Sequence, residues 1–148
     1  MRLLTDKPKF KLVLVVFLAL LSACTHVHHR AYEVASQSNI SSDKVFEELQ
    51  RFFAEKGLVQ VQGGVDKNAT KVLHYQLRTN QGAMLPTAPS DYLSLRLLGD
   101  GFVELELTRI TSGANFSEDF LVHFKSSIEE ALERRLGYKV FLKLKTSQ

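Results

Sequence analysis

The chain has 148 residues, of which 45% are hydrophobic and 24% are charged, the composition of one ordinary globular domain. Its net charge of +3 arises in the first eleven residues, where Arg2, Lys7, Lys9 and Lys11 oppose Asp6; removing these from the totals of 19 basic and 16 acidic residues leaves 15 of each. Because the remainder is neutral, the charge argues against a nucleic-acid-binding surface.

The cationic start is followed by an apolar run from Leu12 to Leu21. A charged segment before about ten apolar residues is the pattern of a secretory signal, and the run is shorter than the roughly 18 residues that cross a bilayer. Leu21 stands where an ordinary signal-peptidase site needs a small residue, so ordinary cleavage is not expected.

The next residues, Leu21-Ser22-Ala23-Cys24, resemble the lipobox of bacterial lipoproteins, in which Leu, then Ser or Ala, then Ala or Gly precede the cysteine. The resemblance implies that residues 1–23 are a signal peptide cleaved between Ala23 and Cys24. It also implies that Cys24 receives a diacylglycerol and an acyl chain on its amine, which anchors a protein stably. An aspartate after the cysteine tends to retain proteobacterial lipoproteins at the inner membrane; with Thr25 there, we expect the outer membrane, facing the periplasm.

After the cysteine, residues 24–40 show no sustained period and end in a polar cluster, which predicts a flexible tether. No other cysteine follows, so we expect no disulfide in the domain of residues 41–148. A helix is predicted from an N-cap at Ser42 to a stop at Gly57. One face of that helix would carry the apolar stripe Val45, Phe46, Leu49, Phe52 and Phe53.

Alternating residues predict strands over residues 58–62, 71–78, 92–98 and 102–110. The last two are joined by Gly99-Asp100-Gly101, and a three-residue loop aligns their leucine faces. Counting from that loop sets Leu97 opposite Val103. The same register sets Leu95 opposite Leu105, Leu93 opposite Leu107 and, on the other face, Arg96 opposite Glu104.

A second helix is predicted from a capping box at Asn115 and Glu118 to Gly137. Its apolar stripe would be Phe120, Phe124, Ile128, Ala131, Leu132 and Leu136. A last strand is predicted over residues 138–145, with Tyr138, Val140, Leu142 and Leu144 facing inward. The fold class is therefore α+β, with the order helix, four strands, helix, strand. We expect a two-layer sandwich in which both helices pack on one face of a mainly antiparallel sheet of four to five strands.

The other face of this sheet would be free of helices and mostly polar. It would carry His74, Gln76, Arg78, Tyr92, Arg96, Leu98, Phe102, Glu104, Glu106, Phe141, Lys143 and Lys145. A long loop, residues 79–91, joins two strands that a tight turn could connect, and it presents Met84, Leu85 and Pro86. This loop, together with Phe141, is the predicted partner-binding surface.

No residue pattern in the chain predicts catalysis or a cofactor. Glu104 and Glu106 share a strand face, as paired glycosidase carboxylates do, but Arg96 is positioned to pair with Glu104. His26, His28 and His29 could bind zinc, yet a tether does not fix ligands in a tetrahedral array, so no metal site is predicted. Loops containing Gly63-Gly64 and Gly99 lack the lysine and helix of a phosphate loop.

These features favour a binding protein over an enzyme. The expected function is a lipid-anchored accessory or assembly subunit of an envelope or secretion complex, with an envelope protein as partner and no nucleic acid. The expected architecture is broadly similar to that of accessory envelope lipoproteins, including the lipopolysaccharide-assembly lipoprotein, although fold alone does not imply function. The alternatives are a periplasmic immunity or inhibitor lipoprotein and a metal-handling lipoprotein.

Overall fold

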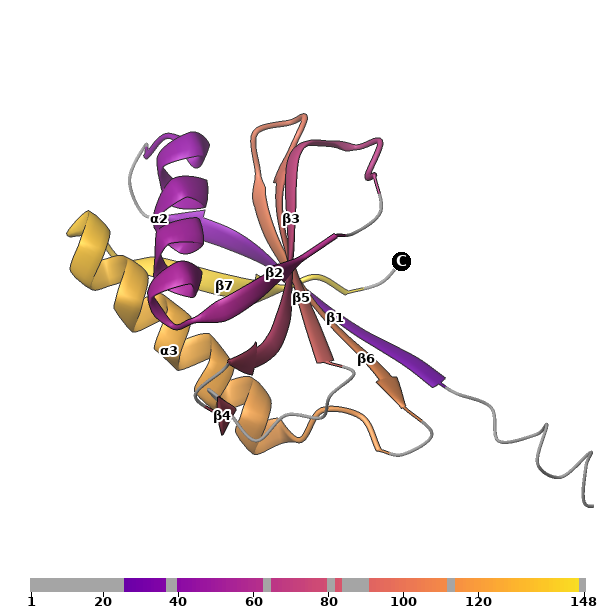
Figure 1. Ribbon diagram of the computed structural model, residues 1–148. Coiled ribbons are helices and arrows are strands. Elements are labelled where there is room, and N and C mark those ends of the chain that lie inside the picture. The colour runs from indigo at the N-terminus through magenta and orange to yellow at the C-terminus, as the bar shows by residue number, and fades with distance from the viewer. Residues whose placement is uncertain are drawn as a thin grey trace, which may run out of the picture.

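Two amphipathic helices and an antiparallel sheet make up the computed structural model, which describes residues 26–36, 40–62, 65–79, 82–83, 91–111 and 114–146. In chain order the elements are β1 (His26–Ser36), α2 (Ser42–Glu55), β2 (Leu58–Val61), β3 (Ala69–Thr79), β4 (Gly82–Ala83), β5 (Asp91–Leu98), β6 (Val103–Thr111), α3 (Glu118–Leu136) and β7 (Val140–Leu144). The fold is therefore α+β, as predicted (Figure 1).

The helix stripes are confirmed, but the predicted N-caps are displaced by one or two residues. All five stripe residues of α2 are buried, and its N-cap is Ser41 rather than Ser42. In α3 the N-cap is Ser117, whose hydroxyl accepts a hydrogen bond from the Phe120 N–H at 3.2 Å, so the predicted cap at Asn115 is wrong. The helix ends where expected, because Gly137 adopts a left-handed conformation with φ of 73°.

Strand β1 occupies much of the segment that we expected to be a flexible tether. The sheet has the order β2-β3-β5-β6-β1-β7, all pairs are antiparallel, and the two-residue β4 pairs with β3. The tether prediction is thus wrong for His26–Ser36, and the sheet exceeds the predicted four to five strands. Tyr32 is the only buried residue of β1, so the strand shows no apolar periodicity in the sequence. Backbone hydrogen bonds to the neighbouring strands stabilise it instead.

The β5–β6 hairpin has the register predicted from its loop length. Leu97 lies opposite Val103, Leu95 opposite Leu105, and Leu93 opposite Leu107. The Leu98 N–H donates to the Phe102 carbonyl at 2.8 Å, and Gly101 supplies the turn with a φ of 85°. Because side chains alternate along a strand, this register turns all six residues toward the helices.

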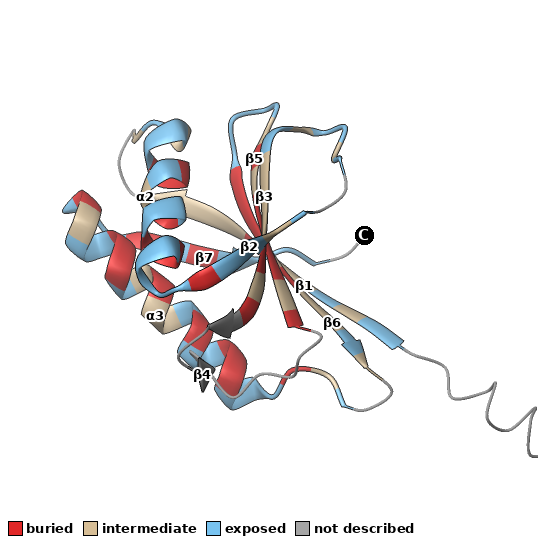
Figure 2. Ribbon diagram, viewed as in Figure 1, coloured by how far each residue is buried: buried red, intermediate tan, exposed pale blue. Residues whose placement is uncertain are grey.

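The hydrophobic core lies between the two helices and one face of the sheet, and Figure 2 shows the buried residues facing that space. Its fully buried side chains include Leu49, Phe53, Leu93, Leu95, Leu105, Leu107, Phe124, Ile128 and Leu132. In β7 Val140 and Leu142 are buried, whereas Leu144 lies on the same face, opposite Tyr32, but is exposed. Tyr138 precedes the strand and is exposed, so its predicted inward placement is wrong. The part of the chain that the structure describes contains no helix with the length and apolarity to span a membrane.

Candidate functional site

Strand register arranges the helix-free face of the sheet in rows that run across the strands. One row consists of Arg96, Glu104, Glu33 and Lys143. A second row contains His74, Ser94, Glu106 and Ala31, and a third contains Gln76, Tyr92, Thr108 and His29. Residues from five strands therefore form one largely polar surface, and β1 contributes a member to each row.

Arg96 stands at the centre of an ion network made of Asp66, His29, Arg96, Glu104, Glu106 and Lys145. Its Nη1 donates to Glu104 Oε1 at 3.0 Å, its Nε lies 3.2 Å from Asp66 Oδ2, and its Nη2 contacts Glu106. The Arg96–Glu104 pair was predicted from the hairpin register and is confirmed. One guanidinium thus holds three carboxylates, of which Glu104 and Glu106 come from β6 and Asp66 comes from the segment between β2 and β3.

Two further groups complete the network. Lys145 donates to Glu104, and this hydrogen bond is the main reason why the pKa of Lys145 is raised above its ordinary value. His29 Nδ1 lies 2.7 Å from Glu106 Oε1. Glu104 has an exposed fraction of only 5% although it lies on the helix-free face, because its neighbours cover it. The network is therefore a pre-arranged set of fixed charges in which Glu104 and Glu106 are both already bonded to cations.

An open hollow of about 640 Å³ lies over the ion network. It is lined by His29, Arg30, Ala31, Arg96, Glu104, Glu106, Leu144, Lys145 and Thr146. The N-terminal half of β1 and the C-terminal end of β7 contribute to it, so it arises only because β1 lies between β6 and β7. The arrangement suits recognition of polar or charged groups by fixed hydrogen-bonding partners.

Apolar side chains flank the network at one end of the sheet. Phe141 lies opposite Ala35 in the β1–β7 ladder, and Phe102 comes one residue beyond the last β1–β6 pair, Val34 with Val103. By this register Phe102, Ala35 and Phe141 form an aromatic row, in which the phenylalanines are 47% and 40% exposed. The predicted binding residues Met84, Leu85 and Pro86 lie outside the described residues, as do Ala23 and Cys24.

The three N-terminal histidines do not converge. Alternation along β1 places His26 and His28 on one face, with ring centroids 6.2 Å apart, and His29 on the other face. In the described ranges no three or more His, Cys, Asp or Glu side chains gather in a way that could hold a metal ion.

A buried ion pair lies at the end of β5, where the sequence predicts a loop. Asp91 is the first residue of β5 and lies opposite Arg109, and two parallel hydrogen bonds of 2.8 and 2.7 Å join them. The hydrogen bond to Asp91 is the main cause of the raised pKa of Arg109. The guanidinium also lies 4.4 Å from the centroid of Phe116. No periodic signal marks such a pair, since both residues terminate otherwise apolar faces.

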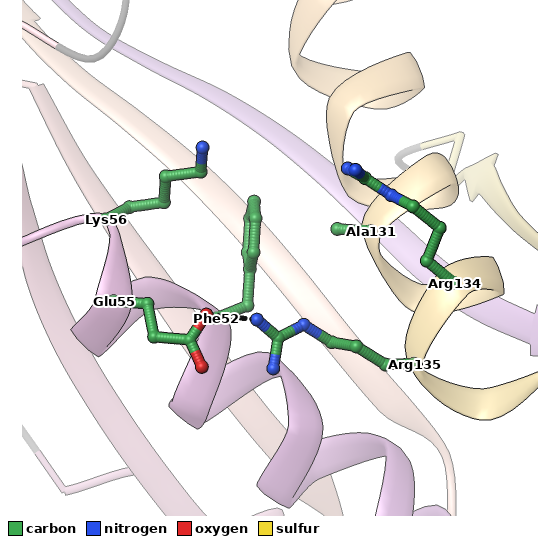
Figure 3. A pocket seen from close by; sticks show the side chains of 6 residues that line it. All are labelled: Phe52, Glu55, Lys56, Ala131, Arg134 and Arg135. Carbon is green, nitrogen blue, oxygen red and sulfur yellow. Dashed lines mark hydrogen bonds and ion pairs between the residues drawn. The ribbon is translucent and has the colours of Figure 1, made fainter.

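A second hollow, of about 300 Å³, lies between α2 and α3 (Figure 3). Phe52 stands between Lys56 and Arg135, whose cationic groups lie 5.6 and 5.8 Å from its ring centroid. Arg135 pairs with Glu55 and lies 3.5 Å from Glu48. Cations near the last turns of the two helices complement the helix dipoles. These contacts between α2 and α3 are therefore explained by helix packing, without a ligand.

Comparison of the sequence with known proteins identifies no relative. No protein-family model matches the sequence, and a search of curated proteins finds no match.

Proposed function

We propose that this protein is a lipoprotein anchored through Cys24 to the outer membrane, facing the periplasm, where it serves as a protein-binding accessory subunit of an envelope complex. The anchor is supported by the Leu21-Ser22-Ala23-Cys24 motif directly after an apolar run. The binding role is supported by the sheet, which leaves one face free of helices and carries fixed charges on it.

The observation that carries the binding role is the exposed aromatic row. Phe102 and Phe141 keep 47% and 40% of their surface exposed at one end of the sheet, separated by the small residue Ala35. Aromatic side chains that enter a partner's pocket supply much of the binding free energy of protein interfaces. Two of them on one rigid row form a preorganised anchor of this kind.

The ion network beside the row would supply specificity. Arg96, Glu104 and Lys145 hold one another in place, so a partner meets charges whose positions do not change on binding. Fixed charges at an interface favour complementary partners and penalise those with like charges. Capture should therefore depend on the aromatic row for affinity and on the network for selection.

The test of the binding role is photocrosslinking in cells from Phe102 and, separately, Phe141 of the intact chain. The matched control is Val122, which is 65% exposed on the outer side of α3. We expect one envelope protein to be captured from both phenylalanine positions and not from Val122, and Phe141→Ala to weaken capture from Phe102. Equal capture from all three positions, or none from the aromatic row, would refute the proposed surface.

The anchor is tested separately by the mass of the mature N-terminus and by membrane fractionation. We expect a diacylglyceryl group and an acyl chain on Cys24, and release of a Cys24→Ala variant from the outer-membrane fraction. An unmodified thiol at Cys24 in the cell would refute the anchor while leaving the aromatic row to its own test.

A further inference from the structure

Strands β1 and β6 continue together beyond the rest of the sheet. The last pair of β5 with β6 is Asp91 with Arg109, and β7 pairs with β1 only from Tyr32 onward. The β1–β6 ladder nevertheless extends to His26 and Thr111. Residues His26 and Val27, paired with Thr111 and Ile110, therefore form a projecting two-stranded ribbon tip (Figure 1).

The ribbon tip exposes an apolar pair. Val27 and Ile110 lie directly opposite each other on the helix-free face and are 51% and 43% exposed. The tip contains no lysine, arginine, aspartate or glutamate, and Arg109 at its base is paired with Asp91. Two-stranded ribbons are marginally stable on their own in water, so a contact that buries the Val27–Ile110 pair would stabilise this one.

Cys24 lies close to the ribbon tip in the sequence, and its proposed lipid indicates what the tip would contact. Only Thr25 separates Cys24 from His26, where β1 begins. An extended chain spans at most about 3.6 Å per residue, so the Cα atoms of Cys24 and His26 are no more than about 7 Å apart. A lipid on Cys24 would hold the tip at the membrane surface, because no tether of useful length intervenes.

We propose that the ribbon tip lies against the lipid surface, with the Val27–Ile110 pair at the boundary between headgroups and acyl chains. This inference rests on the lipidation of Cys24 in the proposed function. Its contact is apolar, as for other peripheral elements that bury a small hydrophobic face at the interface. The membrane thereby determines which end of the sheet faces the periplasm.

The same placement would hold the aromatic row away from the bilayer. Ile110 is eight steps along the extended chain from Phe102, which corresponds to about 27 Å at the usual rise of a strand. Phe102 and Phe141 would then stand at the opposite end of the sheet from the lipid. A partner in the periplasm or in a neighbouring envelope complex could reach them without entering the membrane.

The test measures depth in the membrane with nitroxide labels on the intact lipidated chain, reconstituted in phosphatidylethanolamine and phosphatidylglycerol vesicles. Single substitutions Ile110→Cys and Val27→Cys report on the tip, and Phe102→Cys is the matched control, since it replaces another exposed apolar residue of the same face. We expect labels at positions 27 and 110 to collide with oxygen and to be shielded from a water-soluble nickel chelate. The label at position 102 should show the opposite behaviour.

Each other result has a distinct meaning. A lipidated chain whose labels at 27 and 110 meet the nickel chelate as readily as the label at 102 overturns the tip contact alone. Spin–spin broadening between labels at 110 on two molecules overturns it in favour of a second copy, and loss of nickel access only when an envelope protein is added overturns it in favour of a protein partner. A chain without lipid on Cys24 overturns the anchor and the tip contact together.

Discussion

Asp91 and Arg109 lie opposite each other on β5 and β6 and form a two-point ion pair in which Asp91 has no exposed surface. Arg109 also donates to the Asn115 carbonyl at 3.2 Å and lies over Phe116. The pair therefore joins the end of the sheet to the segment that leads into α3. It fixes the place where the ribbon tip leaves the body of the sheet.

Removing the charge of Asp91 should destabilise the domain substantially. Asp91→Asn leaves a largely buried guanidinium without its counter-ion, and breaking such a pair costs about 3 kcal/mol of unfolding free energy. Replacing both partners by apolar residues, Asp91→Leu with Arg109→Met, should cost much less. Urea denaturation of the variants measures this, and equal stability of Asp91→Asn and the natural chain would contradict the structural role.

Arg96, at the centre of the ion network, should contribute far more to the unfolding free energy than an exposed ion pair on a helix does. Arg96→Ala leaves the buried Glu104 with Lys145 as its cationic partner within the network, and we expect a loss of about 2 kcal/mol of unfolding free energy. Arg51→Ala is the matched control, because Arg51 pairs with Glu48 while exposed, and should cost less than about 0.5 kcal/mol. Similar losses in the two variants would argue against a built network.

Glu129 should protect the edge strand β7 against pairing with a strand of another molecule. Its carboxylate accepts a hydrogen bond of 2.7 Å from the backbone N–H of Leu142 in the edge strand β7. Glu129→Ala should lose about 1 kcal/mol and increase concentration-dependent association, since an unpaired edge N–H can recruit another strand. Glu129→Gln keeps an acceptor and serves as the control. Thermal melts and sedimentation at several concentrations distinguish the variants.

Tyr75 should make the domain sensitive to alkaline pH. Burial raises the pKa of its phenol, and no hydrogen-bond partner of its hydroxyl is found among the described residues. The folded state therefore keeps its proton at a pH where the unfolded chain, with a pKa near 10, loses it, so stability falls as pH rises above about 10.

Tyr75→Phe removes both the ionisable phenol and the unpaired buried hydroxyl. At neutral pH it should leave stability unchanged or raise it by up to about 1 kcal/mol, because no unpaired hydroxyl remains buried. Above pH 10 its stability should fall less steeply than that of the natural chain, as followed by urea denaturation at each pH. A fall of the same steepness would show that another group controls the alkaline limit.

The sequence by itself determined the elements whose signals are local. The stripes of α2 and α3 are visible because five or more apolar residues recur at helical spacing, and Gly137 ends a helix through its own backbone freedom. The β5–β6 register follows from a three-residue loop, and the Arg96–Glu104 pair follows from that register. Each depends on residues close together in the chain.

Only the tertiary structure decided the role of residues 26–36 and the composition of the candidate site. Strand β1 buries one side chain, so its conformation depends on hydrogen bonds to β6 and β7, which lie far away in the sequence. Long-range strand pairing brings Asp66, His29 and Lys145 into contact with the ion network. It also aligns Phe102 with Phe141 and pairs Val27 with Ile110. Such pairing has no local period, because the free energy that selects it comes from contacts between distant segments rather than from neighbouring residues.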